Sequence, residues 1–307
     1  MTRRGLILFA LMSLIWGIPY LFIRIAVAEV SPAVLVFCRT GVGALILVPI
    51  ALARSDLRRV FQRWRWVAAF AAIEMGGPWV LLGSAEQHVT SALAGLLVAG
   101  VPLVGTIVAL VTRGRDRIDG RGFVGLMVGL VGVAAIVGSN MGASDPVAFL
   151  EIALVVVGYA VGPAILARRL DGLSSAGVMA LSLSMCAVVY APIALIQRPA
   201  VMPSEGALAA ILVLGVVCTA IAFMLFWALI EEIGPVRATV ITYVNPAVAS
   251  FLGVLVLSET FTPAMAIGLA LVIAGSTLAT RRPRVAVSGA ADPEPLGTLN
   301  LGSTSDS

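Results

Sequence analysis

The chain has 307 residues, of which 60% are hydrophobic and only 12% are charged. Soluble domains carry about 25% charged residues, so this composition cannot build a polar surface around a globular core. It excludes a soluble enzyme, a nucleic-acid-binding protein and a disordered chain. A mean hydropathy of +1.06 leaves a polytopic membrane protein, with the lipid bilayer as a partner and no nucleic acid.

Ten apolar runs are long enough to cross a bilayer, and the sequence therefore predicts an all-α protein with ten transmembrane helices. A spanning helix needs about 20 apolar residues, and charged residues, prolines or glycine clusters mark the ends of each run. The runs cover residues 5–28, 32–53, 66–85, 89–111, 123–139, 146–167, 174–196, 206–230, 234–257 and 263–280.

All 20 basic residues are arginines, and their distribution predicts the orientation. With the N-terminus in the cytoplasm, every arginine except three falls in a cytoplasmic loop or end. Arg24 and Arg39 lie within spans, and Arg198 lies in an outer loop. Because positively charged loops stay on the cytoplasmic side, we expect both termini in the cytoplasm, which agrees with an even number of spans.

The sequence indicates no metal site, no cofactor and no enzyme. Cys38, Cys186 and Cys218 fall in separate apolar runs without metal-ligand spacing. There is no GxxxxGK[ST] loop, no HExxH motif and no serine paired with a base. The single histidine, His88, falls in an outer turn.

An internal repeat divides the chain. A shift of 143 residues superposes Trp16 on Tyr159 and residues 49–52 (PIAL) on residues 192–195 (PIAL); a shift of 144 superposes Pro19 on Pro163 and Pro102 on Pro246. We therefore predict two five-helix repeats, residues 1–143 and 144–284, followed by a disordered cytoplasmic tail, residues 285–307. Five spans per repeat make the second repeat inverted, which places a substrate site near the midplane between the halves.

Motifs in both halves resemble the drug/metabolite transporter superfamily, specifically its EamA-type ten-helix permeases. They are Trp16-Gly17, Phe22-Ile23-Arg24, Arg39 after Pro32, the segment from Ser91 to Pro102, residues 234–238 (GPVRA), Pro246, and residues 257–262 (LSETFT). The first half departs from the pattern, because residues 113–116 (RGRD) stand where a counterpart of Ser258-Glu259 would follow the fourth span. The resemblance implies an inner-membrane permease for a small metabolite or drug, often an exporter.

Two charged residues lie deep within spans. Arg39 lies about 10 Å from the outer end of the second span, and Glu74 about 12 Å from the inner end of the third. A charge at such depth must pair, face a cavity or lose its charge. We consider two interpretations: Arg39 binds a substrate carboxylate with Glu74 as gate or proton carrier, or the two form a static structural pair.

Aromatic and polar residues add to this candidate site. Trp16, Tyr20 and Arg24 follow one stripe of the first span, which either lines a cavity together with Tyr159 or packs, with Arg24 reaching the outer headgroups. Tyr243 and Asn245 form a second polar group.

Four prolines are predicted to break or hinge the spans: Pro19, Pro102, Pro163 and Pro246. Pro102 and Pro246 each leave one carbonyl without its helical donor, and backbone freed at membrane depth is tolerated where it meets protein or water. We therefore expect their helices to border the pathway; the alternative is that proline is simply commoner in membrane helices than in soluble ones.

Small residues form one face of the fifth span (Gly125, Gly129, Gly132) and one of the tenth (Ala266, Ala270, Ala274). They predict close helix packing, either within the monomer or across a homodimer.

The predicted function is alternating-access secondary transport of a small metabolite, an amino-acid-like compound or a drug, and the resemblance implies export as its direction. The alternatives are a carrier of sugar phosphates or nucleotide sugars and a membrane scaffold without transport. The sequence does not specify the substrate, the direction, the coupling ion or the role of Glu259.

Overall fold

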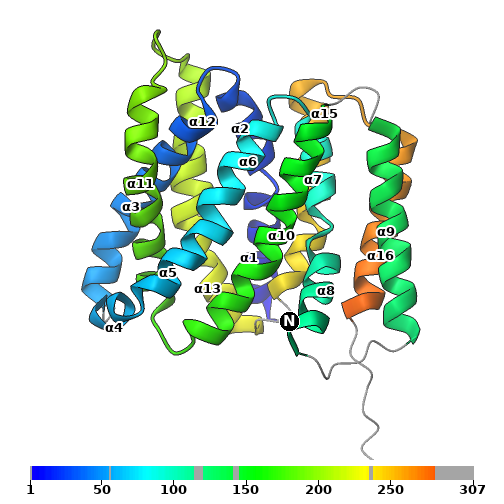
Figure 1. Ribbon diagram of the computed structural model, residues 1–307, viewed down its shortest axis with the longest axis horizontal. Helices are drawn as coiled ribbons and strands as arrows, with labels where there is room; N and C mark the ends of the chain where they lie inside the picture. Colours follow the sequence, from blue (N-terminus) through cyan, green and yellow to red (C-terminus); the bar gives the residue numbers. More distant parts are fainter. Residues whose placement is uncertain (1, 55–56, 114–119, 141–144, 235–237, 281–307) are drawn as a thin grey trace, which may run out of the picture.

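The computed structural model describes residues 2–54, 57–113, 120–140, 145–234 and 238–280. In these ranges every regular element is a helix, and Figure 1 shows the helices side by side with their loops at two opposite ends. The N-terminus and the end of the last helix lie at the same end of the bundle.

The helices of the first half follow the predicted spans closely. They are α1 (Arg3–Ile15) and α2 (Pro19–Val27), α3 (Pro32–Arg54), the short α4 (Leu57–Gln62), then α5 (Trp64–Phe70), η1 (Ala71–Gly76) and α6 (Gly77–Ala85) in one continuous segment, α7 (Ser91–Val98) with α8 (Val101–Arg113), and α9 (Gly120–Asn140).

The second half contains α10 (Pro146–Arg169), α11 (Ser175–Ile196), the continuous segment of α12 (Glu205–Gly215), η2 (Val216–Ile221) and α13 (Ala222–Ile233), then η3 (Thr239–Tyr243) with α15 (Asn245–Leu257), and α16 (Pro263–Thr280). η1 and η2 are π-helical turns, and η3 is a 3₁₀ turn.

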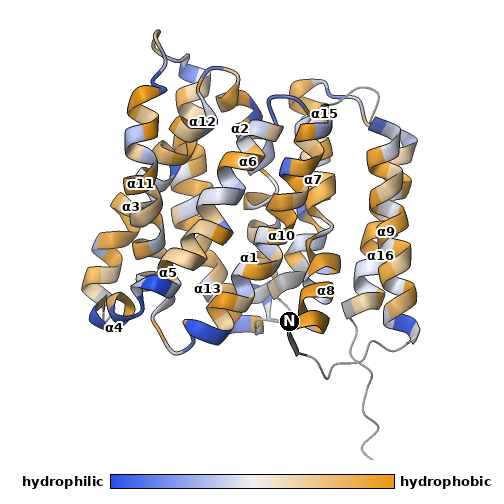
Figure 2. Cartoon of the chain, in the orientation of Figure 1, coloured by the Kyte–Doolittle hydropathy of each residue, from blue (hydrophilic) through white to orange (hydrophobic). Residues whose placement is uncertain are grey.

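The prediction of a polytopic all-α membrane protein is confirmed. Eight helical segments of the described chain have the length and apolar composition of a membrane span, and Ile241–Leu257 and Pro263–Ala279 are shorter apolar helices. Large apolar side chains such as Leu45, Val188 and Ile196 are 73–83% exposed, as expected of a lipid-facing surface. In Figure 2 hydrophobic residues cover the middle of the bundle, and hydrophilic ones gather toward its ends.

Sequence signals explain where several helices begin. Thr90, Ser174 and Ser204 each accept a backbone N–H of the first helical turn at 3.2–3.3 Å, and Asp145 does so at 2.9 Å before Pro146. A side-chain oxygen at this position satisfies an N–H that has no partner within the helix, and proline fits the first helical position because it has no N–H to satisfy.

Three of the four predicted proline breaks occur. The first span is interrupted between Ile15 and Pro19, the fourth between Val98 and Val101 before Pro102, and the ninth where η3 meets α15 before Pro246. The prediction for Pro163 is wrong, because α10 continues through it from Pro146 to Arg169. Proline removes a single helical hydrogen bond, and α10 remains helical despite that loss.

The glycine face of the fifth span packs against the tenth span within the monomer, but the predicted alanine face of the tenth span does not take part in this contact. α9 and α16 stand together at one side of the bundle (Figure 1). A Cβ placed on Gly132 would lie 2.8 Å from the carbonyl oxygen of Gly268, and one on Gly268 would lie 2.9 Å from the carbonyl oxygen of Gly132. The alanines at positions 266, 270 and 274 are exposed. The predicted residue boundary near 143 and the tail from 285 to 307 lie outside the described residues.

Candidate functional site

Arg39 is the buried charge at the centre of the candidate site. It lies in α3, and only 7% of it is exposed. Its Nε donates to the Thr219 hydroxyl oxygen at 2.9 Å, and its guanidinium carbon lies 3.7 Å from the centre of the Trp79 ring. Within the described part of the chain, the two terminal nitrogens of Arg39 make no hydrogen bond, and no carboxylate lies within ion-pair distance of them.

Thr219 is held in place by the π-helical turn η2. Its hydroxyl donates to the carbonyl of Leu214, five residues earlier, at 2.8 Å. A π-helical turn inserts one residue and changes the usual pairing of carbonyls with N–H groups. The Thr219 side chain satisfies a carbonyl at this turn and presents its free lone pair to Arg39.

Aromatic side chains complete what we call the central polar cluster, which consists of Tyr20, Arg39, Trp79, Tyr159 and Thr219. Tyr20 and Trp79 are each only 7% exposed. The Arg39 charge lies close enough to both tyrosines for electrostatic interaction. The five residues come from α2, α3, α6, α10 and η2, and therefore from both halves of the chain.

Glu74 lies in the other π-helical turn, η1, and faces α10. Its Oε2 is buried and has no hydrogen-bond partner in the described structure. Gly162 makes room for it, because a Cβ at that position would lie 2.9 Å from the Cβ of Glu74. The turn itself is satisfied from α11: the Tyr190 hydroxyl donates to the carbonyl of Gly76 at 2.9 Å, and the Cys186 thiol to that of Ala71 at 3.6 Å.

Arg39 and Glu74 do not form the ion pair that the sequence suggested. The ion pair found in the described structure joins Arg4 and Glu232 at 3.6 Å. The sequence argument rested on depth in the membrane alone. Arg39 turns toward Thr219 and Trp79, whereas Glu74 points toward Gly162 on α10.

Trp16, Tyr20 and Arg24, the predicted stripe on the first span, make contacts in three different places. Trp16 packs against Phe226 and Phe223 of α13, with ring centroids 4.7 and 6.2 Å away. Arg24 donates from a terminal nitrogen to the carbonyl of Glu86. Tyr20 alone joins the central polar cluster, whereas Trp16 packs against α13.

Glu86 is a buried acid that sequence reasoning missed. It follows the last residue of α6, has no exposed surface, and both its carboxyl oxygens lack a hydrogen-bond partner in the described structure. Burial raises the pKa of the Glu86 carboxyl well above its ordinary value, and Glu259 adds to the rise, while Arg24 opposes it. Its place beside Gln87 and His88 resembles an exposed turn, so no local signal indicates the burial.

Glu259 has a clear structural role. Its carboxylate accepts the backbone N–H of Ser91 at 2.8 Å, that of Ala92 at 2.9 Å, and the Ser91 hydroxyl at 3.0 Å. It therefore caps the N-terminus of α7, where an acid is stabilised by unpaired N–H groups and by the helix dipole.

The remaining predicted residues lie at the break of the ninth span. Tyr243 ends η3, and Asn245 begins α15; both are half-buried. With its amide oriented to satisfy its neighbours, Asn245 donates to the carbonyls of Ile241 at 2.9 Å and Ser13 at 3.2 Å. It thus joins the broken span to α1, which is a structural contact outside the central polar cluster.

Comparison with known proteins finds one family along almost the whole described chain. The EamA-like transporter family matches twice, over residues 3–138 and 147–281. The Escherichia coli K12 protein described as the uncharacterized inner membrane transporter YedA is 25% identical over 282 residues, 89% of each chain. The Bacillus subtilis 168 protein described as the uncharacterized transporter YvbV is 21% identical over 286 residues, 92% of this chain and 93% of that one.

The fold also matches a solved structure. One crystal structure, described only as that of a protein, superposes with a TM-score of 0.65 at 23% sequence identity, covering 91% of this chain and 97% of the other. The likeness concerns the fold alone.

Proposed function

Because the chain belongs to the EamA-like transporter family, and so is a membrane transporter, we propose that it exports a small metabolite with a carboxylate group by alternating access. In this proposal it is a multi-pass inner-membrane protein with both termini in the cytoplasm. The two family matches are inverted repeats, and the substrate binds between them at the central polar cluster.

The observation that supports this proposal is the unsatisfied guanidinium of Arg39. Burial of an unpaired charge is costly, and in the described structure the terminal nitrogens of Arg39 have no acceptor. Thr219 and Trp79 hold the group from its Nε and its face, which leaves the two terminal nitrogens for an incoming anion. A carboxylate matches two such donors in a bidentate pair.

The surroundings of Arg39 favour a carboxylate over a phosphate. A dianionic phosphate group would call for more than one buried cation, and Arg24, the other arginine within a span of the first half, is engaged by the Glu86 carbonyl. Tyr20, Tyr159 and Trp79 offer rings and hydroxyls to the rest of an amino-acid-like substrate. We therefore favour this class over sugar phosphates, nucleotide sugars and a scaffold role.

Glu74 is proposed as the proton carrier that couples transport to the proton gradient. Its buried oxygen has no protein donor in the described structure, so a proton on the carboxyl would relieve the cost of burial. The breaks before Pro19, Pro102 and Pro246 are the proposed hinges, because they interrupt helices next to the cluster.

An untargeted comparison of exported metabolites tests the proposal. Cells that overproduce the wild-type chain, Arg39→Lys or Arg121→Lys are compared with deletion cells. We expect one group of carboxylate-bearing compounds to appear in the medium with wild type and Arg121→Lys and to be lost with Arg39→Lys. Lysine carries the same charge, but it lacks the planar guanidinium that donates two parallel hydrogen bonds to a carboxylate. Export of cations, or full export by correctly inserted Arg39→Lys, would contradict it.

A further inference from the structure

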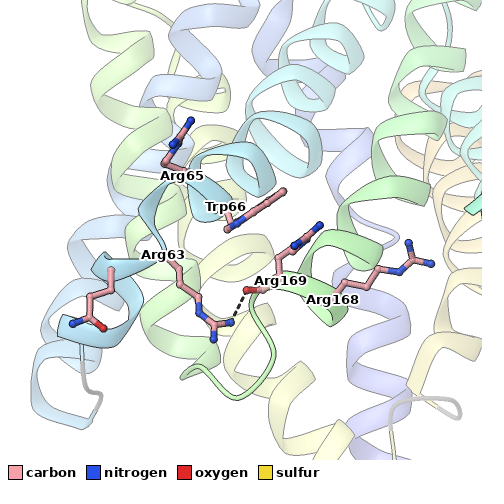
Figure 3. A pocket seen from close by; sticks show the side chains of 6 residues that line it. Arg63, Arg65, Trp66, Arg168 and Arg169 are labelled. Atoms are coloured by element: carbon pink, nitrogen blue, oxygen red, sulfur yellow. Dashed lines mark hydrogen bonds between the residues drawn. The ribbon is translucent and has the colours of Figure 1, made fainter.

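A basic pocket opens at the arginine-rich end of the bundle, away from the central polar cluster. Its volume is about 430 Å³, and it lies between the start of α5 and the end of α10 (Figure 3). Its lining is formed by Gln62, Arg63, Arg65, Trp66, Arg168 and Arg169. Arg63 and Arg65 come from the first half of the chain, and Arg168 and Arg169 from the second.

Contacts within the pocket fix two of these arginines. A terminal nitrogen of Arg63 donates to the carbonyl of Arg169 at 2.8 Å, the dashed line in Figure 3. The Arg169 guanidinium lies 4.4 Å from the centre of the Trp66 ring. In the described part of the chain, Arg63, Arg65 and Arg169 have no carboxylate within ion-pair distance. The pocket therefore concentrates positive charge that its own walls do not neutralise.

An apolar groove continues from this pocket on the other side of Gln62. Its volume is about 660 Å³, and its lining comes from α3, α4 and α11: Val48, Leu57, Arg58, Phe61, Gln62, Ala180, Leu181 and Ser184. Val48 lies six residues before the end of α3, and Ser184 nine residues after the start of α11. At 1.5 Å per residue the groove reaches about 9 to 14 Å into the bundle from its basic end.

We propose that the pocket and the groove together bind one phospholipid with an anionic headgroup, with its phosphate among the arginines and an acyl chain along the groove. The two hollows share Gln62, so a polar site and an apolar site adjoin as headgroup and chain do. Three aromatic side chains that are 41–63% exposed lie beside the pocket in the chain: Phe61, Trp64 and Trp66. Aromatic residues concentrate at the membrane interface, and basic pockets there bind anionic headgroups.

Such a lipid would bridge the two halves of the chain, because its headgroup contacts the start of α5 and the end of α10. The proposal does not depend on the transported substrate. Its test measures binding and leaves transport aside.

Native mass spectrometry of the full chain in detergent tests the proposal with phosphatidylglycerol, phosphatidylcholine and inorganic phosphate as probes. We expect one retained phosphatidylglycerol per chain and no comparable retention of phosphatidylcholine. Arg65→Gln should reduce retention about fivefold. The matched control, Arg121→Gln, removes the same charge from an exposed site on α9 and should leave retention unchanged.

Three outcomes would overturn the proposal: equal retention of both lipids, an equal loss with Arg121→Gln, or displacement of the lipid by millimolar inorganic phosphate. The last would assign the arginines to a soluble phosphate compound. If Arg65→Gln fails to fold, Arg63→Gln applies the same test from the other side of the pocket.

Discussion

The π-helical turns η1 and η2 start 145 residues apart, at Ala71 and Val216, yet different side chains surround them. The fourth residue of η1 is Glu74, and the fourth of η2 is Thr219. In η1 the freed carbonyls are satisfied by Tyr190 and Cys186 of α11, and Glu74 keeps a buried oxygen without a partner. In η2 the threonine satisfies its own turn and accepts from Arg39. The corresponding π-helical turns thus carry a buried acid in the first half and, in the second half, a threonine that holds Arg39 in place.

The largest expected effect follows the loss of the acid from η1. Glu74→Gln removes titration while keeping the shape, so it should abolish accumulation driven by a pH gradient and preserve downhill exchange. One pH unit is worth about 1.4 kcal/mol per proton, or about tenfold accumulation. Uptake into proteoliposomes with and without the gradient measures this.

Glu231→Gln, at an exposed site near the end of α13, is the matched control for Glu74→Gln and should behave as wild type. If Glu74→Gln accumulates substrate normally while Glu86→Gln does not, the proton carrier lies at the buried turn after α6 instead.

The second effect concerns the anchor in η2. Thr219→Val keeps the shape and removes the oxygen that accepts from Arg39, so the guanidinium loses its orientation. Hydrogen bonds to charged groups contribute about 1.5–3 kcal/mol, so we expect the KM to rise about 10- to 100-fold. Thr219→Ser should restore most of the affinity. An unchanged KM in Thr219→Val would mean that Arg39 does not contact substrate from this position.

A smaller effect is expected for Tyr190, which stabilises η1 from α11 by a hydrogen bond. Tyr190→Phe leaves the Gly76 carbonyl without its donor, which should lower the free energy of unfolding by about 1 kcal/mol. Thermal unfolding in detergent measures the loss, and the KM should stay within about twofold of wild type. A large change in KM with unchanged stability would place Tyr190 in the pathway and weaken the contrast between the two turns.

The smallest effect concerns the helix that leads into η2. Glu29 accepts the backbone N–H and the hydroxyl of Ser204 at 2.6 and 2.5 Å, and these bonds lower the pKa of its exposed carboxyl. The resulting stability is present above the ordinary pKa of glutamate and is lost as pH falls through the lowered value. The stability difference between wild type and Glu29→Gln should therefore shrink below about pH 4. Thermal unfolding between pH 7 and pH 3 tests this, and a stability difference that stays constant over that range would contradict it.

The sequence predicts the helices well because apolar length and proline are local signals. The spans, the shared end of the N-terminus and the last described helix, and the breaks before Pro19, Pro102 and Pro246 all follow from runs of neighbouring residues. Pro163 shows the limit of that logic, since α10 tolerates the loss of one hydrogen bond.

The site is less predictable, because its contacts join distant residues. Arg39 and Thr219 are 180 residues apart, and neither the π-helical turns nor the burial of Glu86 has a compositional signature. Arg39, Glu74 and Tyr20 stand out as charges or rings within spans. Trp79 and Thr219 look like ordinary apolar and small polar residues until the helices are packed.

The cap that Glu259 places on α7 has a consequence for biogenesis. The capping carboxylate lies 168 residues after Ser91 in the chain, and a ribosome adds about 5–20 residues per second, so roughly ten to thirty seconds separate the synthesis of the helix from that of its cap. During that interval the first N–H groups of α7 must be satisfied by water or headgroups at the membrane surface. The five spans made first therefore reach their final state only when the ninth has been inserted, and the two halves mature together.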